Sequence, residues 1–352
     1  MDYIAYYEKL ADLQGDNPLA HARTKDTETS VPSIARPLLF NIAGEIKNKF
    51  NEFGSPMPPL MEGCTVLVLC CGTGRDVYLA AQLVGEDGKV IGLEPVDSKL
   101  EVAERYLKKE IKQFGYSKCN VEFLKAAPEN MEEIADDSMD IVISNCTFNM
   151  SPDKEAYIKE VQRVLKDNGE FYFTDIFTDR RIPEELSSDP AKVAIELGGA
   201  MYINDFRRLV QANGFKDPRY LFTNKTPMSE DEQAMFPDIA FATITSRLIN
   251  SQWTEDVCES YGETITYKGT LPGYPDYFLF DKDIKFPTGK TCTICGNVSG
   301  TVAKTRYSKA FDFTFDRSKH LGDTHGDHII KTAPDWDGEI DEDDQPQKVS
   351  CC

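Results

Sequence analysis

Hydrophobic and polar positions between residues 61 and 223 form a pattern that predicts strands and helices in alternation. The apolar run at residues 66–69 has the length and branching of a buried strand, and a helical pattern follows it. The expected strands are residues 66–69, 89–93, 121–125, 140–145 and 170–177, and the expected helices include one capped by Asp97 and those at 153–165 and 204–213. This alternation predicts an α/β fold with a parallel sheet covered by helices on both faces.

The flanking regions have a different pattern. Residues 34–50 predict one amphipathic helix within an N-terminal segment that spans residues 1–60. Residues 224–333 favour one strand that completes the sheet and a smaller C-terminal α+β lobe. Their alternating segments, typical of antiparallel strands, are at 241–248, 264–267, 277–286 and 302–314. Residues 334–352 are acidic, end in Cys351 and Cys352, and are expected to be a disordered tail.

A Gly-rich turn follows the first strand. Gly72 and Gly74 turn the chain where a cofactor can approach the backbone. Glu94 ends the second strand twenty residues after Gly74, where an acidic residue accepts hydrogen bonds from a ribose. The run LCCGTGRD lacks the GxGxxG pattern that seats a pyrophosphate. With Glu129 after the third strand and DIVISN as the fourth, the layout favours an S-adenosylmethionine methyltransferase over a dehydrogenase.

Charge and cysteine content narrow the class of partner. The formal net charge of −20 over 352 residues disfavours nucleic-acid partners and anionic membranes, because both need a cationic face. No signal peptide or membrane span is visible, so we expect a cytoplasmic protein. In that compartment, ten cysteines indicate reduced thiols used for metal, metalloid or redox chemistry, or buried as small hydrophobic side chains.

Longer segments of the chain resemble arsenite methyltransferases. They are YYEKLADLQ at 6–14, GCTVL at 63–67, SNCTFNMSPDK at 144–154, DIFTDRRIPEEL at 175–186, LGGAMYINDFRRLV at 197–210, YKGT at 267–270, CGNV at 295–298 and KTRY at 304–307. The resemblance covers nearly the whole chain to about residue 315, and it implies a class I, Rossmann-like methyltransferase fold.

The resemblance also implies a function. It is the transfer of a methyl group from S-adenosylmethionine to trivalent arsenic held by cysteine thiolates, with glutathione or thioredoxin as the source of further thiols. Cys146 matches a family cysteine and becomes the candidate catalytic thiolate. The expected cofactor-binding residues are Cys71, Gly72, Thr73, Gly74, Arg75, Asp76, Glu94, Glu129 and Asn145. The expected substrate region is Cys146, Glu196, Gly198 and Gly199, with no resident metal.

The chain departs from the family at three of its four arsenic-binding cysteines. Pro18, Phe53 and Glu196 stand in their places, and only Cys146 is retained. The cofactor turn differs as well, since Val68 replaces an acidic residue and Cys70 replaces a glycine. A side chain at residue 70 takes up room near the cofactor and strains the backbone if φ is positive.

Three functions remain open at this point. The chain is an arsenite methyltransferase of altered range that accepts thiol-bound or already methylated arsenic, a paralogue that methylates another small acceptor, or a non-catalytic relative that binds metalloid. A further motif, Cys292-x-x-Cys295, has the spacing of a zinc knuckle. Without a second such pair and with histidines spread apart, it does not predict a closed zinc site.

Overall fold

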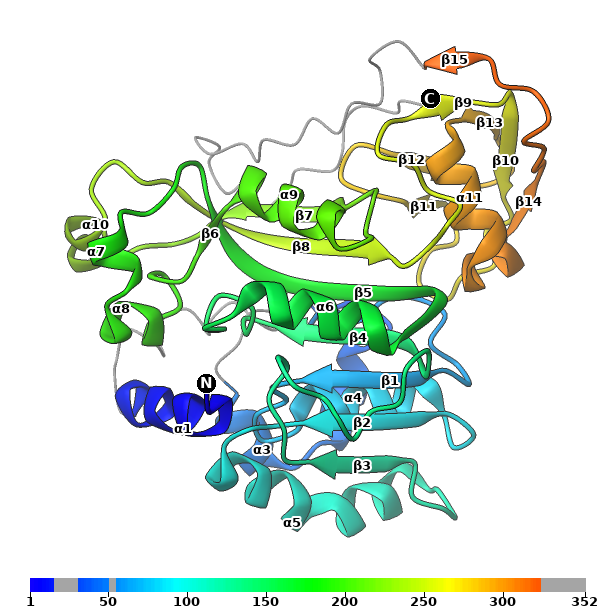
Figure 1. Ribbon diagram of the computed structural model, residues 1–352. Helices are drawn as coiled ribbons and strands as arrows, with labels where there is room; N and C mark the ends of the chain where they lie inside the picture. Colours follow the sequence, from blue (N-terminus) through cyan, green and yellow to red (C-terminus); the bar gives the residue numbers. More distant parts are fainter. Residues whose placement is uncertain (16–30, 51–54, 324–352) are drawn as a thin grey trace.

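The computed structural model of the protein describes residues 1–15, 31–50 and 55–323 (Figure 1). The predictions made for Pro18, Phe53 and the tail at 334–352, including Cys351 and Cys352, lie outside the described residues.

The main sheet has the strand order β3-β2-β1-β4-β5-β8-β7, and β6 pairs with β5. Strands β1 to β5 run parallel, whereas β8 runs antiparallel to both β5 and β7. The strands are β1 Thr65–Leu69, β2 Lys89–Leu93, β3 Val121–Leu124, β4 Met139–Asn145, β5 Leu165–Thr178, β6 Met201–Tyr202, β7 Arg219–Lys225 and β8 Phe241–Ile249. The predicted parallel sheet is therefore confirmed.

Each face of this sheet has its own apolar core, because successive side chains of a strand point to opposite faces. In β1, Val66 and Val68 pack with the face covered by α3, α4 and α5. Leu67 and Leu69 pack with the face covered by α6 and α9, which lie in front of the sheet in Figure 1. The helices associated with this domain are α1 Tyr3–Gln14, α3 Gly44–Asn48, α4 Arg75–Val84, α5 Asp97–Phe114, α6 Lys154–Val164, α7 Glu184–Ser187, α8 Pro190–Ala194, α9 Ile203–Ala212 and α10 Glu230–Met235.

The sheet extends beyond the boundary predicted at residue 223, which falls inside β7. One strand of residues 224–333, β8, completes the sheet as predicted by pairing with β5 along residues 241–249. The strand β7, which the sequence did not predict, pairs on the outer side of β8. Asp97 is also not the cap of α5. It is the first helical residue after Val96, and its carboxylate forms an ion pair with Lys125 at 2.6 Å.

The prediction of a single helix over residues 34–50 is wrong. The structure has a 3-10 helix, η2 Arg36–Asn41, followed by the short α3. Between them Ile42 and Ala43 have extended backbone angles, and the amide of Ala43 donates to the buried Glu110 carboxylate at 3.2 Å. A tertiary hydrogen bond thus ends the helical run, which the local pattern could not indicate.

The C-terminal lobe follows β8 and has a core of its own. Its strands are β9 Glu259–Ser260, β10 Glu263–Tyr267, β11 Tyr277–Leu279, β12 Lys285–Pro287, β13 Thr291–Ile294, β14 Phe311–Phe313 and β15 Gly322–Asp323. The strand predicted over 302–314 is wrong for most of its length, because α11 Gly296–Lys304 and η3 Arg306–Ala310 precede β14. Residues 296–302 are all buried, so this helix lacks the one-sided pattern that would reveal it.

The lobe is attached at the edge of the sheet where its parallel strands begin. Glu170, in the first half of β5, forms an ion pair with Arg306 and accepts a hydrogen bond from the Tyr307 hydroxyl at 3.1 Å. Figure 1 shows α11 and β10 on this side, while α1 lies at the opposite side, toward which β1 and β2 point. The C-terminal lobe and α1 therefore lie at opposite edges of the sheet.

Candidate active site at the carboxyl edge of the sheet

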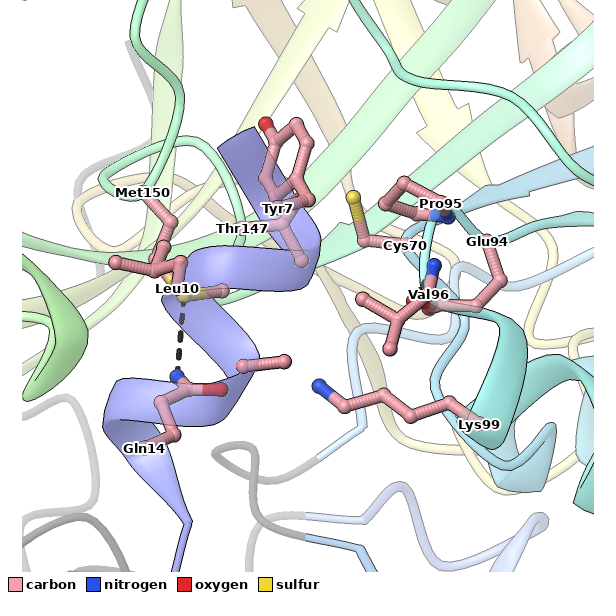
Figure 2. A pocket seen from close by; sticks show the side chains of 11 residues that line it. Tyr7, Leu10, Gln14, Cys70, Glu94, Pro95, Val96, Lys99, Thr147 and Met150 are labelled. Atoms are coloured by element: carbon pink, nitrogen blue, oxygen red, sulfur yellow. Dashed lines mark hydrogen bonds between the residues drawn. The ribbon is translucent and has the colours of Figure 1, made fainter. Parts of the chain in front are cut away.

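A pocket lies between α1 and the carboxyl ends of β1, β2 and β4 (Figure 2). Helix α1 covers one side, and the loops after the strands form the other. It is lined by Tyr7, Leu10, Ala11, Gln14, Cys70, Glu94, Pro95, Val96, Lys99, Thr147 and Met150. Gln14 Nε2 holds α1 in place by donating to Met150 Sδ at 3.3 Å and to the carbonyl of Ala194 at 3.2 Å. This is the edge at which open parallel sheets bind ligands.

The turn after β1 has an unusual backbone conformation. Cys70, Gly72 and Gly74 have φ angles of 43°, 57° and 91°. At Gly74 a Cβ would approach Ala103 Cβ to 3.1 Å, so this glycine allows α4 to pack closely against its neighbours. Cys70 adopts the same left-handed region with a side chain, which costs roughly 1–3 kcal/mol. The strain expected for a cysteine at this position is therefore present.

Glu94 ties the turn after β1 to the turn after β2. Its carboxylate accepts hydrogen bonds from the amide of Gly72 at 2.7 Å and from the amide of Val96 at 3.0 Å. Burial raises its pKa, an effect that Lys99 and these amides oppose. A carboxylate has about four acceptor positions, so two remain for hydroxyl groups of a ligand. The acidic residue expected after the second strand thus holds the two turns together, and its contact with a ligand stays a prediction.

The start of α4 brings together several residues predicted to bind the cofactor. Asp76 accepts hydrogen bonds from Ser55 Oγ at 2.9 Å and from Asn145 Nδ2 at 3.1 Å, so the ends of β1 and β4 are linked. The guanidinium of Arg75 lies 3.5 Å from the centre of the Phe50 ring. Cys71 is buried, and its amide donates a hydrogen bond to the carbonyl of Leu93 at 2.9 Å.

Thr73 and Val68 contribute to packing instead. The Thr73 hydroxyl donates to the carbonyl of Ile46 in α3 at 3.2 Å. Val68 is buried in the core under α4, so the carboxylate that the family carries there has no counterpart at this position.

Cys146 directly follows β4 and is fully buried. Its amide donates to the carbonyl of Thr174 at 2.8 Å, and its φ of 55° turns the chain sharply away from the sheet. Below this turn the hydroxyls of Ser144, Thr147 and Tyr157 hydrogen-bond one another at 2.7 to 3.0 Å. The hydroxyl cluster holds the turn in place, so the position of the Cys146 thiol is set by β4 and α6.

Glu129 connects α1 to the loop after β4. Its Oε1 accepts hydrogen bonds from the hydroxyl of Tyr7 at 2.8 Å and from Ser151 Oγ at 2.5 Å. Within the part of the chain that the structure describes, its buried Oε2 has no hydrogen-bond partner. Burial raises the pKa of Glu129, and the same effect raises the pKa of the Tyr7 hydroxyl well above its ordinary value.

The predicted substrate region lies against the loop after β4. Asn149 Nδ2 donates to the carbonyl of Ile176 at 2.8 Å and to that of Glu196 at 3.4 Å. A Cβ at Gly199 would lie 1.9 Å from the Asn149 carbonyl oxygen, and one at Gly198 would lie 2.7 Å from the Lys192 backbone. Both glycines therefore permit close backbone packing, which brings Glu196 to the loop of Cys146. Glu196, although it is not a glycine, has a left-handed backbone conformation with a φ of 66°.

Two charged side chains, those of Lys154 and Asp175, support this loop from the sheet side. Lys154 Nζ donates to the carbonyls of Asn149 and Ser151 at 3.1 and 3.0 Å, and Asp175 accepts from the Asn149 amide at 3.2 Å. Burial raises the pKa of Asp175 to about 7 and lowers the pKa of Lys154 to about 8. Both groups titrate near neutral pH because each charge is removed from water.

Sequence reasoning missed the contribution of α1 and of the loop after β4. Tyr7, Leu10, Ala11 and Gln14 recur at helical spacing, but nothing in that spacing says which surface the helix covers. Thr147 and Met150, which also line the pocket, lie within a segment that had been recognised only by resemblance. Among the described residues, no group of three or more His, Cys, Asp or Glu side chains could hold a metal ion, and no helix could cross a membrane.

Comparisons with known proteins agree with this arrangement. Residues 60–214 match the family model of a methyltransferase domain, and residues 261–342 match that of the arsenite methyltransferase C-terminal domain. The arsenite methyltransferase of Aquipseudomonas alcaligenes is 37% identical over 90% of this chain and 91% of its own length. That of Homo sapiens is 32% identical over 88% of this chain and 82% of its own.

A solved structure agrees as well. It is the arsenic(III) S-adenosylmethionine methyltransferase of Chlamydomonas reinhardtii, with 37% identity and a TM-score of 0.80 over 83% of this chain and 99% of that one. The class I methyltransferase fold predicted from the sequence is confirmed. The chain belongs to the arsenite methyltransferase family.

Proposed function

We propose that the protein transfers the methyl group of S-adenosylmethionine to trivalent arsenic bound at Cys146. One observation carries the proposal: Cys146 and the Gly72 turn leave adjacent strands at the same edge of the sheet. Ser144 of β4 pairs with Leu69 of β1, so the thiol and the cofactor turn follow directly from paired residues. Donor and acceptor sites placed in this way remove much of the entropic cost of bringing two reactants together.

The residues at this edge fit S-adenosylmethionine. Gly72 leaves the turn open to close approach, the Glu94 carboxylate retains acceptor capacity for ribose hydroxyls, and Glu129 directs a buried oxygen without a partner among the described residues. The cofactor supplies an electrophilic methyl group on a sulfonium centre. The buried carboxylates of Glu94 and Glu129 suit that positive charge.

The chain's own residues have a limited chemical task. A thiolate at Cys146 is a soft ligand and therefore matches a soft metalloid. Because the lone pair of arsenic is the nucleophile, no general base is needed. Helix α1 covers the pocket and excludes water, while Asn149 and Lys154 hold the loop that carries Cys146.

The loss of three family cysteines defines the form of the substrate. A single protein thiolate supplies one of the three ligands that trivalent arsenic takes, and chelation cannot add to its affinity. The arsenic therefore arrives already carrying small thiols such as glutathione, or already methylated. Glutathione or thioredoxin then supplies the remaining thiols, in a reducing compartment such as the cytoplasm.

The test combines cofactor binding with arsenic speciation. Calorimetry measures the affinity for S-adenosylmethionine, and the products formed from arsenite, glutathione and cofactor are then separated and counted. We expect Cys146→Ser to lower arsenic methylation about 100-fold or more, since it removes the thiolate that positions the acceptor. Its cofactor affinity should stay the same.

Cys119→Ser serves as the control, because Cys119 is an exposed cysteine that lies before the start of β3, away from the carboxyl ends of the strands. Unchanged turnover in Cys146→Ser would contradict the role of this thiol. Cofactor binding without any methylated arsenic would instead favour a paralogue with another acceptor, and no cofactor binding at millimolar concentration would exclude methyl transfer.

A further inference from the structure

Two cysteines of the C-terminal lobe lie side by side although 36 residues separate them in the sequence. The Cys258 thiol donates a hydrogen bond to Cys295, and Cys258 packs against the apolar core of the lobe, which contains Cys295. Cys258 precedes β9 and is half-buried, whereas Cys295 directly precedes α11 and is fully buried. The zinc-knuckle spacing had paired Cys295 with Cys292, but the Cys292 thiol donates to the carbonyl of Lys290 at 3.7 Å.

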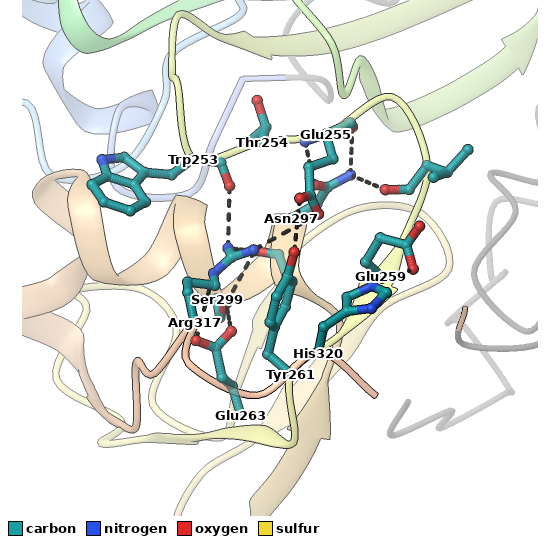
Figure 3. A network of polar contacts seen from close by, with 12 residues as sticks. Trp253, Thr254, Glu255, Glu259, Tyr261, Glu263, Asn297, Ser299, Arg317 and His320 are labelled. Atoms are coloured by element: carbon teal, nitrogen blue, oxygen red, sulfur yellow. Dashed lines mark hydrogen bonds and ion pairs between the residues drawn. The ribbon is translucent and has the colours of Figure 1, made fainter. Parts of the chain in front are cut away.

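The segment before Cys258 is fastened to the start of α11 (Figure 3). Asn297 accepts a hydrogen bond from the amide of Glu255 at 2.7 Å and donates to the carbonyls of Glu255 and Val257 at 2.9 and 3.4 Å. Arg317 donates to the carbonyls of Trp253 and Gly296 at 3.2 and 2.6 Å. These contacts hold Cys258 beside Cys295 without help from a ligand.

A buried arginine of the main sheet completes the group. Arg219, the first residue of β7, donates through Nη2 to Cys258 Sγ at 3.8 Å. Arg219 is 4% exposed, and its guanidinium is oriented by ion pairs with Asp217 at 2.8 Å and with Asp281 at 2.9 Å. Because both carboxylates are already paired with Arg219, they fix its position and leave its edge directed at the sulfur.

The surroundings favour one thiolate within the pair. The hydrogen bond from Cys258, together with Arg219, lowers the pKa of Cys295 to about 7 despite burial, and the same hydrogen bond raises the pKa of Cys258. Cys295 is also the N-cap residue of α11, where the helix dipole stabilises negative charge. The surroundings therefore favour the thiolate at Cys295, with the thiol proton on Cys258.

The composition of the group selects its ligand. Closed zinc sites use four ligands, and the described residues hold no group of three or more His, Cys, Asp or Glu side chains around these sulfurs. Two adjacent thiols, one of them ionised, match a soft electrophile with two exchangeable positions. A monosubstituted trivalent arsenical, R–As(OH)₂, has two such positions, whereas arsenite itself has three.

We propose that Cys258 and Cys295 form a second thiol site that binds monosubstituted trivalent arsenicals, at the opposite end of the sheet from Cys146. In the binding step two As–O bonds break and two As–S bonds form. The two hydroxyl groups leave as two water molecules, one with the thiol proton of the pair and the other with a proton taken from solvent, and no atom changes oxidation state. The site goes beyond the proposed function, because it requires neither S-adenosylmethionine nor methyl transfer.

The experiment uses the full-length reduced protein and phenylarsine oxide as the probe. N-ethylmaleimide labels the native protein with and without the probe, and peptide mass spectrometry measures the labelling rate at the half-buried Cys258. We expect the probe to slow this labelling at least about tenfold, because both sulfurs become arsenic ligands. In Cys295→Ser the protection of Cys258 should be lost, since one thiol no longer chelates.

Cys292→Ser is the matched control, because it removes a buried cysteine of the same lobe outside the proposed pair. Its protection should equal that of the unmodified protein, and thermal melting of both variants verifies that the lobe is folded. Equal labelling of Cys258 with and without the probe would overturn the proposal, as would protection that survives in Cys295→Ser. Protection without any arsenic methylation would contradict the proposed function alone.

Discussion

The protein holds cysteines in two opposite electrostatic environments. At the carboxyl edge, Cys70 is surrounded by an apolar pocket and by the carboxylates of Glu94 and Glu129, and burial followed by these charges raises its pKa well above the ordinary value. In the C-terminal lobe, the hydrogen bond from Cys258 and the charge of Arg219 lower the pKa of Cys295, and this residue lies at the start of α11. The same side chain is thus kept protonated at one site and ionised at the other.

The difference matches the chemistry proposed for each site. A carboxylate-rich pocket suits a positively charged methyl donor, and a thiol at Cys70 stays neutral beside it. A site that captures an arsenical by itself needs a thiolate before the ligand arrives. Surroundings rather than the number of cysteines therefore decide where arsenic binds without a cofactor.

The largest expected effect is on the pH dependence of thiol reactivity. Between pH 8 and pH 9, labelling at Cys295 should change little, because a group with a pKa of about 7 is already mostly ionised. Labelling at Cys70 should rise about tenfold over the same interval, because its raised pKa leaves it a thiol. Site-resolved mass spectrometry after N-ethylmaleimide treatment measures both profiles, and parallel profiles would contradict the contrast.

A second prediction concerns Glu94. In Glu94→Gln the side chain keeps one acceptor oxygen for the two amides of Gly72 and Val96, and it loses the charge that suits a sulfonium. We expect cofactor affinity to fall roughly tenfold, equivalent to about 1.4 kcal/mol, by calorimetry. Protection of Cys258 by phenylarsine oxide should not change.

The control for this variant is Glu232→Gln. Glu232 is equally buried and is part of the capping box of α10, away from the pocket. The substitution Glu232→Gln should lower thermal stability without changing cofactor affinity. If both variants bind the cofactor equally, Glu94 has no role in the site.

The smallest expected effect comes from Cys70→Gly. Glycine relieves the strain of a φ of 43° and removes a side chain that lines the pocket. Thermal unfolding should show a gain of about 1 kcal/mol, and calorimetry a cofactor affinity about threefold higher. Asp137→Gly, at an exposed residue with φ of 48°, should give the stability gain alone. Weaker cofactor binding in Cys70→Gly would show that the cysteine contributes to the site.

Most of the main sheet could be predicted from the sequence, because its strands are short apolar runs separated by amphipathic helices. The region at 34–50 could not, since a hydrogen bond from Ala43 to Glu110 interrupts its helix. The helix α11 was missed because its first seven residues are buried on all sides. In both regions the backbone conformation depends on contacts with residues that are far away in the sequence.

The residues of the candidate site also fall into two groups, those that the sequence predicted and those that only the structure placed. The Gly72 turn, Glu94 and Cys146 were predicted because each follows a strand, and parallel strands bring their carboxyl ends to one edge. Their joint role in binding stays a prediction. Tyr7 and Gln14 joined the site only through the placement of α1, which no periodicity encodes.

The sequence by itself determined the order of strands and helices from β1 to β5, the Gly-rich turn after β1 and the strand end that carries Cys146. Local burial patterns suffice for these features, because each depends on neighbours within a few residues. Only the tertiary structure decided that α1 covers the pocket and that Cys295 meets Cys258 and Arg219 rather than a zinc partner. These tertiary contacts depend on how segments that are distant in the sequence pack together, and such packing is determined by the whole chain.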